Sequence, residues 1–156
     1  MPTIDQDLFR GLGEDDAARI LGLGRPIRLA AGQELFALGA DAGDVYLVER
    51  GHLALTLPMH VGGRDQDILV EERKAGQIVG WSGLIAPHRF TLKATAQIET
   101  DVRALPRAAL LAYFEQHPAA GYTVMRNLAS AVGQRLQVFQ AMWLREMQRV
   151  VELRAS

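Results

Sequence analysis

The sequence predicts an α+β fold: a β-barrel or jelly roll of about eight short antiparallel strands, with N-terminal helices before it and a long C-terminal dimerisation helix after it. Three observations indicate this fold. Short runs of alternating apolar and polar residues fill the middle of the chain, and glycines separate them at even intervals, as in antiparallel sandwiches and small barrels. Helical periodicity occurs on both sides of that region. No helix long enough for a βαβ crossover interrupts the strands, which argues against a doubly wound sheet.

The length of 156 residues suits one domain that buries its own core. We expect a single domain over 1–156, with N-terminal helices in 1–25, a barrel in 26–106 and C-terminal helices in 107–156. In the first part, Asp5–Phe9 predicts a short turn. A helix then begins near Gly13, where three acidic residues follow and favour a helix N-terminus, and it ends at Gly22 or Gly24.

The middle region divides into strands at its turn signals. Glycine-containing turns such as Gly39-Ala40-Asp41 and Gly62-Gly63 separate the alternating runs. Strands are expected at Ile27–Leu29, Glu34–Ala37, Asp44–Glu49, His52–Leu57, Asp67–Glu72, Ile78–Val79, Leu92–Glu99 and Asp101–Leu105. Connections as short as these join antiparallel neighbours, because parallel strands need a longer crossover.

Two helices are expected after the barrel. The first, Arg107–Gln116, ends before His117-Pro118, because a residue that precedes proline disfavours the α region. The second runs from about Ala119 to about Arg154 and would be about 50 Å long, more than one small barrel can cover. Its apolar residues recur at steps of three, four and seven, with a last step of eight, close to the pattern of a coiled-coil seam. They are Met125, Leu128, Val132, Phe139, Met142 and Val150.

The far half of this helix therefore needs a partner. Phe139, Met142, Trp143 and Met147 would be exposed without one. We expect a homodimer formed through helix 119–154.

Composition and charge exclude several classes of protein. The net charge of −1 argues against a general nucleic-acid-binding protein, and the absence of cysteine excludes disulfides, thiol catalysis and thiolate metal sites. No run approaches the ~18 apolar residues of a membrane span. The acidic start of the chain lacks the basic and apolar regions of a signal peptide. We expect a cytoplasmic protein that does not associate with membranes.

The candidate functional loop is Gly76–Thr91, with the sequence GQIVGWSGLIAPHRFT. It predicts a short strand that leads into a glycine-flanked turn and then into a basic loop ending in His88-Arg89-Phe90-Thr91. Backbone N–H groups followed by a cation and a hydroxyl are the groups with which a small loop binds an anion. The sequence therefore predicts an anion-binding loop within the barrel region.

The order of elements, together with two local motifs, resembles the cyclic-nucleotide-binding domain of the catabolite-activator and fumarate–nitrate-regulator superfamily. Gly32–Gly39 (GQELFALG) resembles the family's G-x-x-[LI]-F-x-x-G strand and turn, and Asp44–Gly51 (DVYLVERG) resembles its next strand. Gly76–Thr91 stands where the family carries its phosphate-binding cassette. The resemblance covers nearly the whole chain and implies a ligand-sensing regulatory module.

The cassette itself departs from the family pattern. In the family, backbone amides and an arginine hold the cyclic phosphate, and a glutamate binds the ribose. Gly80 matches, whereas Trp81 stands at the glutamate position, where its N–H group cannot accept the ribose hydrogen bond. An ungapped count places Phe90 at the arginine position. Arg89 reaches the pocket instead if the loop is one residue shorter.

The resemblance also places part of the long helix near the ligand. Arg135–Val138 (RLQV) resembles the stretch that lies against the bound base, and it is followed by Phe139 and Gln140. The candidate ligand-binding residues are therefore Gly80, Trp81, Ser82, Gly83, His88, Arg89, Thr91, Phe139 and Gln140.

Two functions follow from this resemblance and stay open. One is a regulatory module whose altered cassette binds a cyclic nucleotide or another small anion. The other is a dimeric scaffold with a degenerate pocket that binds no nucleotide. Trp81 has three interpretations. It is an aromatic lid over a ligand, a plug that fills the pocket, or a plain core residue.

Two other classes of protein fit less well. A cupin-type metalloenzyme needs a His-x-His pair and further ligands, but His52, His60, His88 and His117 include no pair at ligand spacing. We expect no enzymatic activity, metal or cofactor. DNA-binding members of the family carry a helix-turn-helix domain after the long helix. Because the sequence ends at Ser156, we expect no direct DNA binding and a signal passed to an unknown protein partner.

Overall fold

The computed structural model describes residues 8–156 and confirms the jelly-roll fold. Two four-stranded antiparallel sheets face each other, with strand orders β1-β8-β3-β6 and β2-β7-β4-β5. The strands are β1 (Arg25–Leu29), β2 (Glu34–Phe36), β3 (Asp44–Arg50), β4 (His52–Val61), β5 (Arg64–Lys74), β6 (Ile78–Val79), β7 (Lys93–Ala96) and β8 (Thr100–Pro106). The helices are α1 (Glu14–Gly22), the 3-10 helix η1 (Trp81–Leu84), α2 (Arg107–Gln116) and α3 (Pro118–Ala155).

Strand β3 of the first sheet is buried on both faces. Successive side chains of a strand point to opposite faces, so on β3 Val45 and Leu47 pack against the helices, while Tyr46 and Val48 face the barrel interior. The interior core also contains Phe36 of β2 and Leu55 of β4 in the second sheet, together with Phe90 of the loop that precedes β7. The barrel therefore has one core inside it and a second core between its outer face and the helices.

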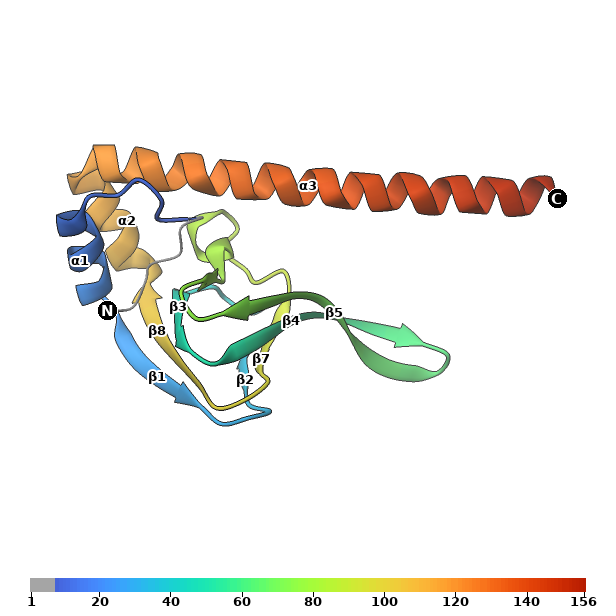
Figure 1. Cartoon of the computed structure of the whole chain (residues 1–156), viewed down its shortest axis with the longest axis horizontal. Helices are drawn as coiled ribbons and strands as arrows, with labels where there is room; N and C mark the ends of the chain where they lie inside the picture. The colour runs from blue at the N-terminus through green and yellow to red at the C-terminus, as the bar shows by residue number, and fades with distance from the viewer. Residues whose placement is uncertain (1–7) are drawn as a thin grey trace.

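The helices close one end of the barrel, as Figure 1 shows. The predicted break at His117-Pro118 is confirmed, since His117 leaves the α region with φ −128° and ψ 73°. Val124 and Leu128 on the first half of α3 are buried in the outer core. Asn127 Nδ2 donates hydrogen bonds of 2.8 Å to the carbonyls of Leu8 and Arg10, which anchors the N-terminal segment on α3.

Several element boundaries differ from those predicted. β4 and β5 extend beyond Leu57 and Asp67 into a long hairpin, whose two-residue turn Gly62-Gly63 has φ of 59° and 78°. Positive φ at both turn residues matches the twist of a hairpin and lets pairing continue to the tip. β7 is shorter than the predicted Leu92–Glu99, because Gln97–Glu99 carry the chain over to the other sheet. The part of the predicted turn before Leu8 lies outside the described residues.

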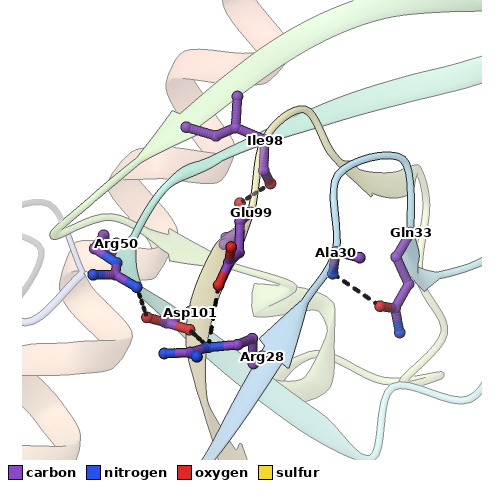
Figure 2. Close-up of polar contacts among 8 residues, drawn as sticks. Arg28, Ala30, Gln33, Arg50, Ile98, Glu99 and Asp101 are labelled. Atoms are coloured by element: carbon purple, nitrogen blue, oxygen red, sulfur yellow. Dashed lines mark hydrogen bonds and ion pairs between the residues drawn. The ribbon is translucent and has the colours of Figure 1, made fainter.

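Ion pairs hold the end of the barrel that lies away from the helices. Figure 2 shows Asp101 of β8 between Arg28 and Arg50, with Asp101 oxygens at 3.0 Å from Arg28 Nε and 3.1 Å from Arg50 Nη2. The hydrogen bond from Arg28 holds the pKa of Asp101 below its ordinary value of 3.8. These charges stabilise the carboxylate form and tie β1 and β3 to β8.

The second half of α3 runs past the barrel, and the β4–β5 hairpin projects in the same direction (Figure 1). Its apolar side chains are exposed in the single chain, with Trp143 62% and Met142 52% exposed. The predicted exposure of this half is thus confirmed. No helix within 8–156 is long and apolar enough to cross a lipid bilayer.

Candidate ligand-binding site

The cassette loop begins with a glycine that no other residue replaces easily. After β6, Gly80 has φ +79°, and a Cβ atom there would lie 2.9 Å from Cε1 of Phe90. The chain then forms η1, in which a Cβ at Gly83 would meet the side chain of Val45 at 3.0 Å and the carbonyl of Ala42 at 3.1 Å. Both glycines of the GWSG sequence therefore allow close packing of the loop against the barrel.

Hydrogen bonds within the loop use several of the amides that the sequence predicted as anion donors. The N–H of Gly83 donates to the Gly80 carbonyl at 3.0 Å, and the N–H of His88 donates to the Ile85 carbonyl at 2.7 Å. The His88 ring Nδ1 lies 2.9 Å from the Gly83 carbonyl oxygen, and His88 itself has φ +60°. These groups hold the shape of the loop, and their N–H bonds are not directed at a ligand.

The loop places Arg89 on the surface and Phe90 inside the barrel. Arg89 pairs with Asp41 in a β-bridge, and its Nη1 donates to the Gly39 carbonyl at 3.0 Å. The Phe90 ring stacks on Phe36 with ring centroids 3.7 Å apart. Of the two alignments that the sequence left open, the one with Phe90 at the inward position describes the structure.

Aromatic side chains fill the space under the cassette. The cavity left beside the Phe36–Phe90 stack has a volume of about 20 Å³, and a cavity of this size holds about one water molecule. Gly80, Trp81, Ser82 and Thr91 line it, whereas His88, Arg89 and Gly83 do not. A nucleotide does not fit here unless the aromatic stack moves.

A much larger groove adjoins this cavity, between β5 and α3. Its volume is about 730 Å³, within the range of small-molecule sites. Trp81 and Phe139 line it, whereas Gln140 is exposed outside it. The apolar wall consists of Leu57, Ile68, Leu69, Val70, Ile78, Val138, Phe139 and Met142. The candidate residues are thus divided between a closed cavity, a surface loop and an open groove.

An arginine cluster lies where the cavity meets the groove. Nη2 of Arg73 on β5 is 2.6 Å from Oε1 of Glu71, and Nη2 of Arg135 on α3 pairs with Oε2 of the same carboxylate. The Arg135 guanidinium carbon also lies 5.0 Å from the centre of the Trp81 ring, a distance typical of cation–π contacts. Trp81 therefore lies under an arginine and packs against the outer core.

Sequence reasoning named none of the three charged residues of this cluster as a site residue. Glu71 and Arg73 lie two residues apart on β5, so they share one face of the strand, but the predicted strand ended at Glu72. Arg135 stood in the RLQV match without a role. If the predicted strand had been continued to Lys74, its period-two alternation could have placed Glu71 and Arg73 toward the helix. It could not have placed them beside Arg135.

Comparisons with known proteins agree with this architecture. The family model described as "Cyclic nucleotide-binding domain" matches residues 26–117, more than half of the chain. No curated protein matches the chain significantly.

Three solved structures illustrate the similarity. A putative cyclic nucleotide-binding protein from Geobacter metallireducens GS-15 shares 26% identity, with a TM-score of 0.67 over 83% of this chain and 91% of that one. The Thermus thermophilus catabolite activator protein shares 25% identity, with a TM-score of 0.72 over 86% of this chain and 60% of that one. The N-terminal domain of a transcriptional regulator from Streptomyces coelicolor A3(2) has the same fold at 22% identity, with a TM-score of 0.71 over 85% of this chain and 90% of that one.

Proposed function

Because the chain belongs to the cyclic-nucleotide-binding domain family, we propose that it is a ligand-sensing regulatory module that binds a cyclic nucleotide or another small organic anion in the groove between β5 and α3. The main support for this proposal is that the groove combines an apolar wall with two arginines at one end. Small-molecule sites have this composition, with a few polar groups that orient an otherwise apolar contact.

The volumes favour the groove over the cassette. The cassette cavity holds about 20 Å³ and the groove about 730 Å³. The base and sugar of a nucleotide need a site of a few hundred cubic ångströms. Phe139 and Met142 offer an apolar surface to a flat ring, and Arg73 and Arg135 offer charge to a phosphate.

The position of the groove also suggests how a signal would leave the module. One wall belongs to the barrel and the other to α3, so an occupant touches both. The exposed apolar half of α3 is the surface through which we propose homodimerisation. A ligand that changes the packing of α3 on the barrel would change that dimer surface, provided that it binds one arrangement more tightly than the other.

A specific observation favours the alternative of a dimeric scaffold without a ligand. Phe36 and Phe90 close the cassette cavity, and Trp81 replaces the family's ribose-binding glutamate. A scaffold of this kind would use the same α3 surface but would not respond to any nucleotide.

A thermal-shift titration separates the two functions. Cyclic AMP, cyclic GMP and a cyclic dinucleotide would be tested against the full chain, with adenosine as the control that lacks phosphate. A ligand at a hundred times its dissociation constant stabilises the folded state by about 2.7 kcal/mol, or roughly 5–10 °C for a domain of this size. Unchanged melting with all three would contradict the sensing function.

A pair of variants on α3 tests the place of binding. Phe139→Ala removes a side chain that lines the groove, whereas Leu144→Ala removes an exposed side chain that does not. We expect Phe139→Ala to reduce the ligand-induced shift and Leu144→Ala to leave it near that of the parent. Equal shifts in both variants would place the ligand elsewhere.

A further inference from the structure

We propose that Arg73 and Arg135 form the clamp for the ligand's oxyanion group, and that Glu71 occupies this clamp as an internal anion until the ligand displaces it. This inference rests on the proposed function, since it names the charged end of the same site. In this arrangement, side chains of β5 and α3 bind the anion. The cassette residue Arg89 takes no part in binding it.

The geometry of Glu71 carries the inference. Each oxygen of its carboxylate contacts a different arginine, Oε1 with Arg73 Nη2 at 2.6 Å and Oε2 with Arg135 Nη2. The carboxylate thus bridges two guanidinium groups that come from separate elements and lie 62 positions apart in the chain. A carboxylate or phosphate of a ligand would present the same pair of oxygens, because guanidinium groups bind both in this way.

The cluster keeps capacity for a further anion. Two guanidinium charges face one carboxylate, which leaves a net positive charge. Within residues 8–156, no hydrogen-bond acceptor is within reach of the buried Nε of Arg73. A buried N–H of a charged group without an acceptor is destabilising, so an incoming oxygen that accepts from it gains an interaction that Glu71 does not supply.

The surroundings favour an anion with an organic body. The Trp81 ring lies below the Arg135 guanidinium, and the apolar wall of the groove begins beside it. The side chains of Arg73 and Arg135 are 13% and 23% exposed, so solvent reaches them only in part. Charge pairs are stronger in such partly buried sites than on an open surface.

The cassette offers no comparable clamp. The Arg89 guanidinium is exposed and donates to the Gly39 carbonyl, and the amides of Gly83 and His88 bond within the loop.

The ion pair between Glu71 and Arg135 also connects β5 directly to α3. Displacement of Glu71 by a ligand would therefore exchange an internal tie for a ligand-mediated one, which connects occupancy to the position of α3.

The test uses the full chain with Trp143→Phe, which leaves Trp81 as the sole tryptophan. Cyclic AMP, cyclic GMP and inorganic phosphate are titrated while Trp81 fluorescence is recorded, and calorimetry gives the dissociation constants independently. The variants are Arg73→Gln, Arg135→Gln and Glu71→Gln, with Arg89→Gln as the matched control. Circular dichroism and melting show that each variant is folded before it is titrated.

The expected results differ in sign. Removal of one charged donor weakens binding about 10- to 100-fold in Arg73→Gln and in Arg135→Gln. Glu71→Gln removes the competing anion and tightens binding about tenfold, an outcome that general damage to the fold cannot produce. Arg89→Gln leaves the dissociation constant within about twofold.

Three results would overturn the inference, and they are distinguishable. If a nucleotide binds but Arg89→Gln abolishes binding while the two clamp variants do not, the clamp is wrong and the proposed function stands. If no probe binds the parent or Glu71→Gln, both are wrong. A weaker affinity in Glu71→Gln would also contradict the displacement of Glu71.

Discussion

Replacement of Gly80 by alanine tests the packing that puts Phe90, and not Arg89, inside the barrel. Gly80 has φ +79°, and a Cβ atom on it would lie 2.9 Å from Cε1 of Phe90. Gly63 at the tip of the β4–β5 hairpin provides the matched control. Its φ is +78°, and nothing lies within 4 Å of a Cβ built there. The two positions share the backbone strain and differ in the neighbour.

The expected losses follow from this difference. An alanine in the left-handed region costs about 1–2 kcal/mol at either position, and the lower entropy of the unfolded chain offsets both by the same amount. Only at Gly80 does the alanine methyl group overlap the stacked rings of Phe36 and Phe90, whose centroids lie 3.7 Å apart. Overpacking of this kind costs about 1–3 kcal/mol more.

Urea denaturation of both variants, followed by circular dichroism, measures the two free energies of unfolding. We expect Gly80→Ala to lose about 1–3 kcal/mol more than Gly63→Ala, or roughly 2–12 °C more in melting temperature. Equal losses would mean that the Phe90 ring does not approach Gly80. The assignment of Phe90 to the inward position would then be refuted, and Arg89 would again be a candidate for the pocket.

Three further predictions concern the rest of the molecule. Asn127→Ala removes two hydrogen bonds to the carbonyls of Leu8 and Arg10 and is expected to lower the free energy of unfolding by about 1–3 kcal/mol; unchanged stability in urea would contradict this anchoring. The pKa of Asp101 is lowered chiefly by its hydrogen bond from Arg28, so its contribution to stability is present above pH 3.8 and is lost as the pH falls through the lower pKa of the folded state. Asp101→Asn should therefore flatten the acid limb of a stability–pH curve, and parallel curves for variant and parent would argue against the ion pairs of Figure 2. In sedimentation, the parent should be a dimer and a chain truncated after Val138 a monomer, because the truncation removes the exposed apolar half of α3; a monomeric parent would contradict the proposed dimer.

The barrel was predictable because its determinants are local. Successive side chains of β3 and β8 point to opposite faces whatever their partners are, and His117-Pro118 ends a helix by the geometry of proline itself. The extent of the β4–β5 hairpin was less predictable. Its outer half is exposed. Leu57, Met59 and Val61 continue the alternation of β4, but Pro58 interrupts the run, and proline is disfavoured inside a strand. Only pairing across the Gly62-Gly63 turn shows that the strands continue.

The candidate site was predictable only in part, because it depends on which residues meet across the fold. The sequence by itself determined that Gly76–Thr91 forms a glycine-rich loop within a barrel, and that a long helix with an apolar far half follows it. Because the arginine of the cassette is offset by one residue from the family pattern, the sequence allows two arrangements. Either Arg89 or Phe90 points into the barrel. The choice depends on whether a ring can stack on Phe36, which lies more than fifty positions away in the chain.

The arginine cluster depends on tertiary structure even more strongly. Nothing in the local sequence of β5 relates Glu71 and Arg73 to Arg135, which lies 64 positions after Glu71. The three charges meet because α3 packs along the barrel through Val124 and Leu128 and because β5 extends far enough to present its face to that helix. Side-chain periodicity is a property of one segment, so the sequence alone determined the barrel, the loop and the helix. Ion pairs and aromatic stacks join distant segments, so only the tertiary structure decided which residues form the site.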